Sequence, residues 1–180
     1  MKKNVFVIAF LAIVLMVSNE MTAQEFAKLD VSPMDAAAYP SSYKEANKMV
    51  KIIYSRPQLK GRTVAELAPN GAVWRTGANE ATEITFYKDV IFGDEAVKAG
   101  SYTLFTIPGD EEWTVILSTA KNVWGSYFYN ESEDVVRVTG TVSNIEEVIE
   151  AFSIAFDGTD NDATMYLGFG NTVVTVPIKG

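Results

Sequence analysis

The sequence predicts an all-β fold, an antiparallel β-sandwich or flattened barrel with short helical turns. Apolar and polar residues alternate over many short runs, and glycine, proline, asparagine and aspartate separate these runs. No long stretch has the 3.6-residue period of an amphipathic helix. The 180 residues, 48% of them hydrophobic and 21% charged, are sufficient for one domain with its own core.

The first 23 residues have the order of a secretory signal peptide. Lys2 and Lys3 give a positive start, residues 5–17 form an unbroken apolar run, and Ala23 is a small residue suited to cleavage. The run is shorter than the ~20 residues that a spanning helix needs. We therefore expect export to the periplasm or the extracellular space, with no stable membrane insertion after residues 1–23 are removed.

Residues 24–44 are expected to be an extended arm or linker, because two prolines and a run of alanines leave no clean period. The β-sandwich domain is expected over residues 45–180. Ser42 and Glu45 have the spacing of a capping box, which predicts a short helical turn. The charged residues that follow favour a solvated loop equally well.

The alternating runs predict the strands of the domain. The expected strands span residues 49–55, 83–87, 90–92, 101–107, 113–118, 135–142, 151–156, 163–169 and 172–178. Residues 101–107 and 113–118 flank a Pro-Gly turn and predict a hairpin. A single helical turn is expected over residues 63–67. The side chains expected in one core include Trp113, Val115, Leu117, Phe152, Ile154 and Phe156.

Composition excludes several kinds of chemistry. The chain has no cysteine and no histidine, which excludes disulfides, Ser-His-Asp and Cys-His nucleophile pairs, and ordinary zinc sites. Asp157, Thr159 and Asn161 alternate as in a calcium loop, but the glycine and glutamate of such a loop are missing, so a polar hairpin turn is predicted. The net charge of −8 repels phosphates, and we expect no nucleic-acid partner, no metal and no cofactor.

Residues 73–82 hold the densest group of candidate functional side chains, namely Trp74, Arg75, Asn79 and Glu80. Loops carry function when a rigid scaffold positions them, which favours a binding loop. The alternative is a structural corner, with Trp74 in the core, Arg75 paired with a carboxylate and Asn79 capping backbone groups. The sequence leaves both interpretations open.

The candidate ligand-binding site combines this loop with nearby aromatic and basic residues. Its members are Tyr54, Arg56, Arg62, Trp74, Arg75, Asn79, Glu80 and Trp124. Guanidinium groups bind carboxylates and phosphates through two parallel bonds, and a tryptophan can supply an apolar wall. The sequence therefore predicts a small-anion site, with a peptide or a glycan as other ligands. Residues 124–129 are interpreted either as core or as a stacking surface.

Several motifs occur in a fixed order. They are Tyr-Ser-Arg-Pro at 54–57, Lys-Gly-Arg at 60–62, Val-Trp-Arg-Thr-Gly-Ala-Asn-Glu-Ala-Thr at 73–82, Gly-Ser-Tyr-Thr-Leu-Phe-Thr-Ile-Pro-Gly at 100–109, Glu-Trp-Thr-Val-Ile-Leu at 112–117 and Trp-Gly at 124–125. Their order and spacing resemble the domain-of-unknown-function 2911 family of exported proteins from Bacteroidetes-type bacteria, over about residues 45–178. The resemblance implies a compact, mostly β domain after a signal peptide. It implies no activity and no catalytic residues.

The leading hypothesis is a non-catalytic, exported binding or interaction domain. A second hypothesis is a metal-independent hydrolase, with Glu80 as general base and Arg75 steadying developing negative charge. A third is a purely structural envelope protein that makes contacts through its sheet edges. A pocket around Glu80 would favour the hydrolase, and an exposed apolar patch without a pocket would favour the interaction protein.

Overall fold

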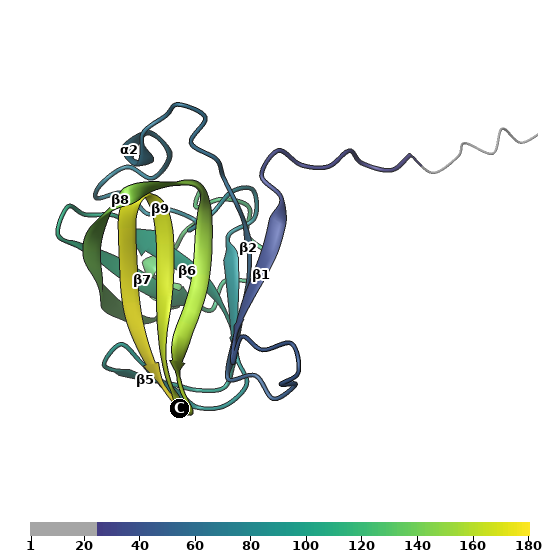
Figure 1. Ribbon diagram of the computed structural model, residues 1–180, viewed down its shortest axis with the longest axis vertical. Coiled ribbons are helices and arrows are strands. Elements are labelled where there is room, and N and C mark those ends of the chain that lie inside the picture. The colour runs from purple at the N-terminus through teal and green to yellow at the C-terminus, as the bar shows by residue number, and fades with distance from the viewer. Residues whose placement is uncertain (1–24) are drawn as a thin grey trace, which may run out of the picture.

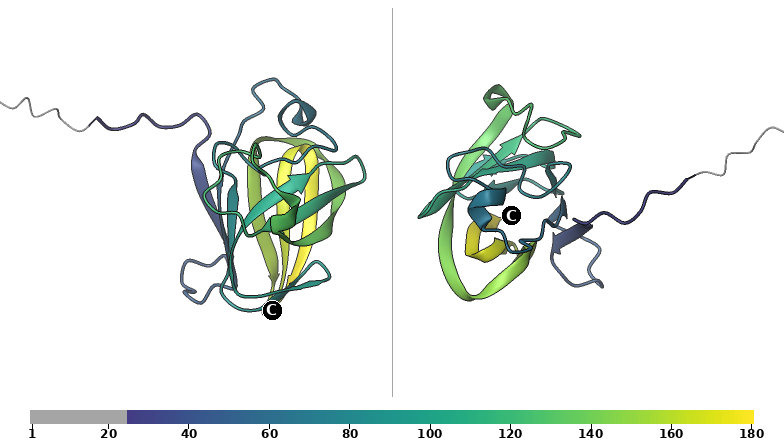
Figure 2. Two further views of the ribbon diagram at one scale, coloured as in Figure 1. Left: turned by 180° about the vertical axis from the view of Figure 1, so that it is seen from behind. Right: turned by 90° about the horizontal axis from the view of Figure 1, so that it is seen from above.

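The computed structural model describes residues 25–180, and the expected signal peptide at residues 1–23 lies outside the described residues (Figure 1). Within the described part, nine strands form one antiparallel sheet in the order β1-β2-β3-β6-β7-β8-β9-β4-β5. Seen from above, the strands surround a common interior (Figure 2). The all-β, antiparallel prediction is confirmed, and of its two forms the single curled sheet matches the flattened barrel.

Most elements follow the predicted order, but the short strand β5 and the 3₁₀ turn η1 were not expected, and residues 93–95 were interpreted as a turn. Their bounds are β1 Met34–Tyr39, β2 Val50–Ser55, α2 Val64–Leu67, β3 Thr82–Phe86, β4 Val90–Phe92, β5 Glu95–Val97, β6 Gly100–Ile107, β7 Glu112–Ser118, η1 Glu131–Glu133, β8 Asp134–Thr159 and β9 Asp162–Lys179. The predicted hairpin is the β6–β7 pair, with Thr103 opposite Ser118 and Ile107 opposite Thr114.

The structure unites two pairs of strands that the sequence separates. Residues 135–142 and 151–156 both belong to β8, and residues 163–169 and 172–178 both belong to β9. The register of the β8–β9 ladder shifts between Asn144 and Ile149 and again between Ile149 and Ser153. Such irregularities bend a strand without ending it, so both strands contribute to two sides of the curled sheet.

β1 differs from the arm or linker expected over residues 24–44. It pairs with β2, with Met34 opposite Ser55 and Tyr39 opposite Val50. Alanine has weak β propensity and the stretch lacks alternation, so its partner strand fixes its conformation. Residues 25–33 precede it as an extended segment, and the Arg56 N–H donates to the Pro33 carbonyl at 3.0 Å.

The capping box lies later in the chain than Ser42. Thr63 Oγ1 accepts from the Glu66 N–H at 3.3 Å, and Glu66 Oε2 accepts from the Thr63 N–H at 2.6 Å. This box begins α2, which confirms the helical turn expected over residues 63–67. Residues 42–47 form no helix, and Lys48 Nζ donates to the Ser42 carbonyl at 2.8 Å, so this stretch is a loop.

The core fills the interior of the curled sheet. Of the six side chains expected there, Trp113, Val115, Leu117, Phe152 and Ile154 are buried and Phe156 is partly buried. Trp74 lies among aromatic rings, with centroids 5.0 Å from Phe152, 6.0 Å from Trp113 and 6.1 Å from Phe169. Burial of one large apolar side chain contributes about 1.5–3 kcal/mol. Among residues 25–180, no helix has the length and apolarity to cross a membrane.

Candidate functional site

Two loops far apart in sequence lie side by side, residues 73–82 and residues 122–126. The contacts are hydrogen bonds of 2.9 Å from Ala81 N–H to the Val123 carbonyl, from Gly125 N–H to the Asn79 carbonyl, and from Ser126 Oγ to the Val73 carbonyl. Glu80 and Trp124 form an isolated β-bridge between the loops. Asn79, Glu80 and Trp124 are thereby brought together.

The first half of the 73–82 loop is a structural corner. Trp74 is buried, and Thr76 is fully buried with φ of 55°, an uncommon conformation for a β-branched residue. The Thr76 carbonyl accepts from Thr82 Oγ1 at 2.6 Å, and its own hydroxyl donates to Thr106 Oγ1 at 3.1 Å. These bonds hold the strained turn and fix the direction in which Asn79 and Glu80 leave it.

Tyr54 and Arg56, both expected to bind ligand, join the end of β2 to the far half of β8, and Tyr54 also lines one of the two hollows described below. Tyr54 Oη accepts from the Ile154 N–H at 2.9 Å. Arg56 donates through Nε to the Phe152 carbonyl at 3.1 Å and through Nη2 to a hydroxyl of the same strand at 2.7 Å. Its Nη1 lies 3.1 Å from Asp35 Oδ2 on β1. These side chains make hydrogen bonds that join β2 to β8, and we call this junction the seam of the curled sheet.

Two of the three arginines of the predicted anion site are engaged by the protein itself. Arg56 is engaged at the seam, and Arg62 donates through Nε and Nη2 to the carbonyls of Leu59 (2.9 Å) and Gln58 (2.7 Å). Arg75 is partly buried, and its Nε is buried without a hydrogen-bond partner. None of the three lines the hollows beside Glu80 described next.

Two adjoining hollows lie where the N-terminal segment passes the paired loops. The first, of about 220 Å³, is lined by Asp30, Ser32, Met34, Ser55, Asn79, Glu80 and Trp124. The second, of about 180 Å³, is lined by Met34, Ile53, Tyr54, Ser55, Glu80, Ala81 and Glu83. Met34, Ser55 and Glu80 line both, so we treat the two hollows as one site, the Trp124 groove.

The Trp124 groove is acidic with apolar walls. Asp30, Glu80 and Glu83 are among its lining residues, which include no lysine or arginine. No salt bridge within residues 25–180 engages these three carboxylates. Trp124 and Met34 supply exposed apolar surface, at 58% and 62% of their full exposure. The groove therefore has a charge opposite to that of the predicted arginine-lined site, because contacts elsewhere engage Arg56 and Arg62.

The aromatic run at residues 124–129 divides between surface and core. Trp124, Tyr127 and Phe128 are exposed, whereas Tyr129 packs its ring 5.2 Å from that of Phe105. The Tyr129 hydroxyl donates to Asp134 Oδ2 at 2.5 Å. Burial, followed by this bond to a carboxylate, raises the pKa of the Tyr129 hydroxyl. Trp124, Tyr127 and Phe128 therefore lie at the surface, whereas Tyr129 packs against the sheet.

The predicted site shares Tyr54, Asn79, Glu80 and Trp124 with the groove, but it did not include Asp30 or Glu83. Asp30 was missed because residues 24–44 were interpreted as an arm or linker without a role in the site. The alternation of β3 does carry a signal for Glu83, since Ile84 faces inward and its neighbour must face outward. Glu83 adjoins the loop that holds Glu80, so that signal was available.

The comparisons with known proteins gave one match. A family model described as "Protein of unknown function (DUF2911)" matches residues 32–178. This range begins earlier than the expected 45–178 and includes β1. No curated protein and no solved structure matches the chain.

Proposed function

The chain belongs to the DUF2911 family, and from that premise we propose that it is a non-catalytic binding domain whose ligand lies in the Trp124 groove. We further propose that it acts after export to the periplasm or the extracellular space, as residues 1–23 predict. The family description names no activity, so the support comes from the chain's own surface.

The observation that carries the proposal is the exposed Trp124 ring beside Asn79 and Glu80 in one hollow. Binding sites combine apolar or aromatic walls with a few placed polar groups. The backbone bonds between the two loops hold this arrangement before any ligand arrives. A site already held in its bound geometry loses less conformational entropy on binding.

The same geometry favours binding over the two other hypotheses. A hydrolase with Glu80 as base was expected to use Arg75 to stabilise developing negative charge, but Arg75 lines neither hollow. A purely structural envelope protein has no need for a preformed groove with an exposed tryptophan. The groove is therefore better explained by a ligand than by chemistry or by scaffolding alone.

A small-anion site at Arg75 is the second candidate. One observation favours it, the buried Nε without a hydrogen-bond partner. Buried polar atoms are nearly always satisfied, and no salt bridge within residues 25–180 engages this guanidinium, so a bound carboxylate or phosphate would supply its missing charge partner. Calorimetric titration of acetate and phosphate should show affinity that Arg75→Ala lowers about tenfold or more. Equal binding by the variant would exclude Arg75.

Tryptophan fluorescence tests the groove directly. The chain has three tryptophans, and Trp74 and Trp113 are 4% and 3% exposed. Acrylamide quenching therefore reports mainly on Trp124, and Trp124→Phe gives the background from the other two. A bound ligand should protect Trp124 from quenching. The panel contains basic, acidic and uncharged peptides and neutral oligosaccharides; if no compound protects Trp124, the proposal is wrong.

A further inference from the structure

We propose that the ligand of the Trp124 groove is a basic peptide segment, whose lysine or arginine side chains enter its two hollows. This inference rests on the binding function proposed above and adds the chemical class of the ligand. Charge, wall composition and the size of the hollows each support it.

Charge is the first argument. Asp30, Glu80 and Glu83 line the groove, and neither a lining lysine nor a lining arginine compensates them. Asp30 Oδ1 accepts from the Ser32 N–H at 2.7 Å, which holds its carboxylate at the groove. The whole chain carries a net charge of −8, so its field attracts cations and repels anions.

The walls are the second argument. A cation over the face of a tryptophan is attracted by the ring quadrupole, and tryptophan is the best aromatic partner for it. Lysine and arginine also carry long apolar stems that cover apolar surface while the charged head stays in water. Trp124 offers the ring, and Met34 and Ile53 offer apolar surface for the stem.

The size of the hollows is the third argument. Each, at about 220 and 180 Å³, is smaller than the ~300–1,000 Å³ of sites that enclose a whole drug-sized ligand. Each suits one long side chain. Because the hollows share Met34, Ser55 and Glu80, one peptide can fill both. In an extended peptide, residues two apart point to the same side, so two basic residues at that spacing can face the adjoining hollows together.

The probe is an acetylated and amidated Gly-Lys-Gly-Lys-Gly peptide, compared with the same peptide carrying glutamine or glutamate in place of lysine. The lysine peptide should protect Trp124 from acrylamide and bind more weakly as salt is raised, since exposed charges are screened. The glutamine peptide should bind at least about fivefold more weakly, and the glutamate peptide should not bind measurably.

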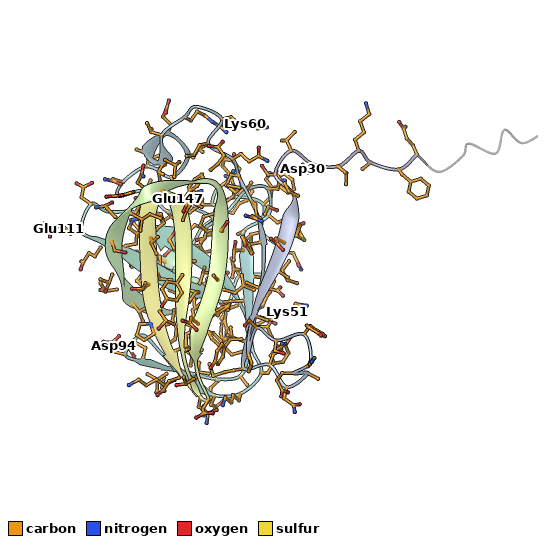
Figure 3. All side chains as sticks on the ribbon, in the orientation of Figure 1. Asp30, Lys51, Lys60, Asp94, Glu111 and Glu147 are labelled. Carbon is orange, nitrogen blue, oxygen red and sulfur yellow. The ribbon has the colours of Figure 1, made fainter. Side chains whose placement is uncertain are left out.

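Charge-reversal variants provide the matched comparison. Glu80→Lys and Glu111→Lys change the net charge equally, and both glutamates are exposed. Glu111 does not line the groove, and it lies across the molecule from Asp30 (Figure 3). We expect Glu80→Lys to weaken binding of the lysine peptide about tenfold or more, and Glu111→Lys to change it less than about twofold.

Each outcome has a defined meaning. Equal binding of the lysine and glutamine peptides, or equal effects of Glu80→Lys and Glu111→Lys, would overturn the basic-peptide inference. Protection of Trp124 by an oligosaccharide or an acidic peptide, but not by the lysine peptide, would overturn it and leave the binding function standing. Absence of protection by every compound would overturn both. Thermal melts of the two variants check that each is folded.

Discussion

Tyr54→Phe removes a single oxygen atom from the seam between β2 and β8. The ring stays, with its edge-to-face contact to Phe152 at a centroid distance of 5.7 Å. The substitution removes the hydroxyl oxygen that accepts a hydrogen bond from the Ile154 N–H at 2.9 Å in a buried position. The bond from the hydroxyl to the Ile154 carbonyl is long, at 3.5 Å, and contributes less.

The size of the expected stability loss follows from the Ile154 N–H, which Tyr54→Phe leaves without an acceptor. A buried donor left without a partner costs about 1–3 kcal/mol, so we expect the free energy of unfolding to fall by that amount. In a chain of this size each 1 kcal/mol lowers Tm by about 2–4 °C. Urea unfolding, followed by tryptophan fluorescence, should show a lower midpoint with an unchanged m-value.

The matched control is Tyr43→Phe, because Tyr43 is 91% exposed and removal of its hydroxyl leaves no buried group unpaired. It should change the free energy of unfolding by less than about 0.5 kcal/mol. If Tyr54→Phe behaves like this control, the tyrosine does not close the seam and the reasoning is refuted.

Three further predictions concern pH, the core and the N-terminus. Burial raises the pKa of the Tyr54 hydroxyl above its ordinary value, so the stability that the neutral hydroxyl contributes is complete below about pH 10 and is lost as the pH rises through the folded pKa. In urea titrations at alkaline pH, Tyr54→Phe should therefore lose less stability than the wild type as the pH rises. An identical pH profile for the two proteins would contradict this. Trp113→Ala should lower the free energy of unfolding by about 3–5 kcal/mol in denaturant melts, because the side chain is 3% exposed; a loss below about 1 kcal/mol would contradict its place in the core. Intact-mass analysis of exported protein should show cleavage near Ala23, and mature protein that still begins at Met1 would argue against a signal peptide.

Local pattern was sufficient for most of the fold. Alternation assigned the inward faces of β7 and β8 through Trp113 and Phe152, and the Pro108-Gly109 turn identified the β6–β7 hairpin. These features depend on residues a few positions apart, because side chains alternate across a strand with a period of two. The alternation did not predict β1, because its alanines form a strand only through pairing with β2.

The site depended on contacts between distant parts of the chain. Sequence selected Asn79, Glu80 and Trp124 as candidate residues, and the structure places them in one groove. It could not assign the arginines, because Arg56 is engaged by Asp35 and by backbone of β8 nearly a hundred positions away.

The sequence by itself therefore determined the fold class, the family, the core faces and the absence of histidine and cysteine chemistry. Only the tertiary structure decided which polar side chains join strands, which remain at the surface and what charge the groove carries. The physical reason is that side-chain alternation is local, whereas the hydrogen bonds and ion pairs of a charged group depend on whichever segments the curled sheet brings beside it.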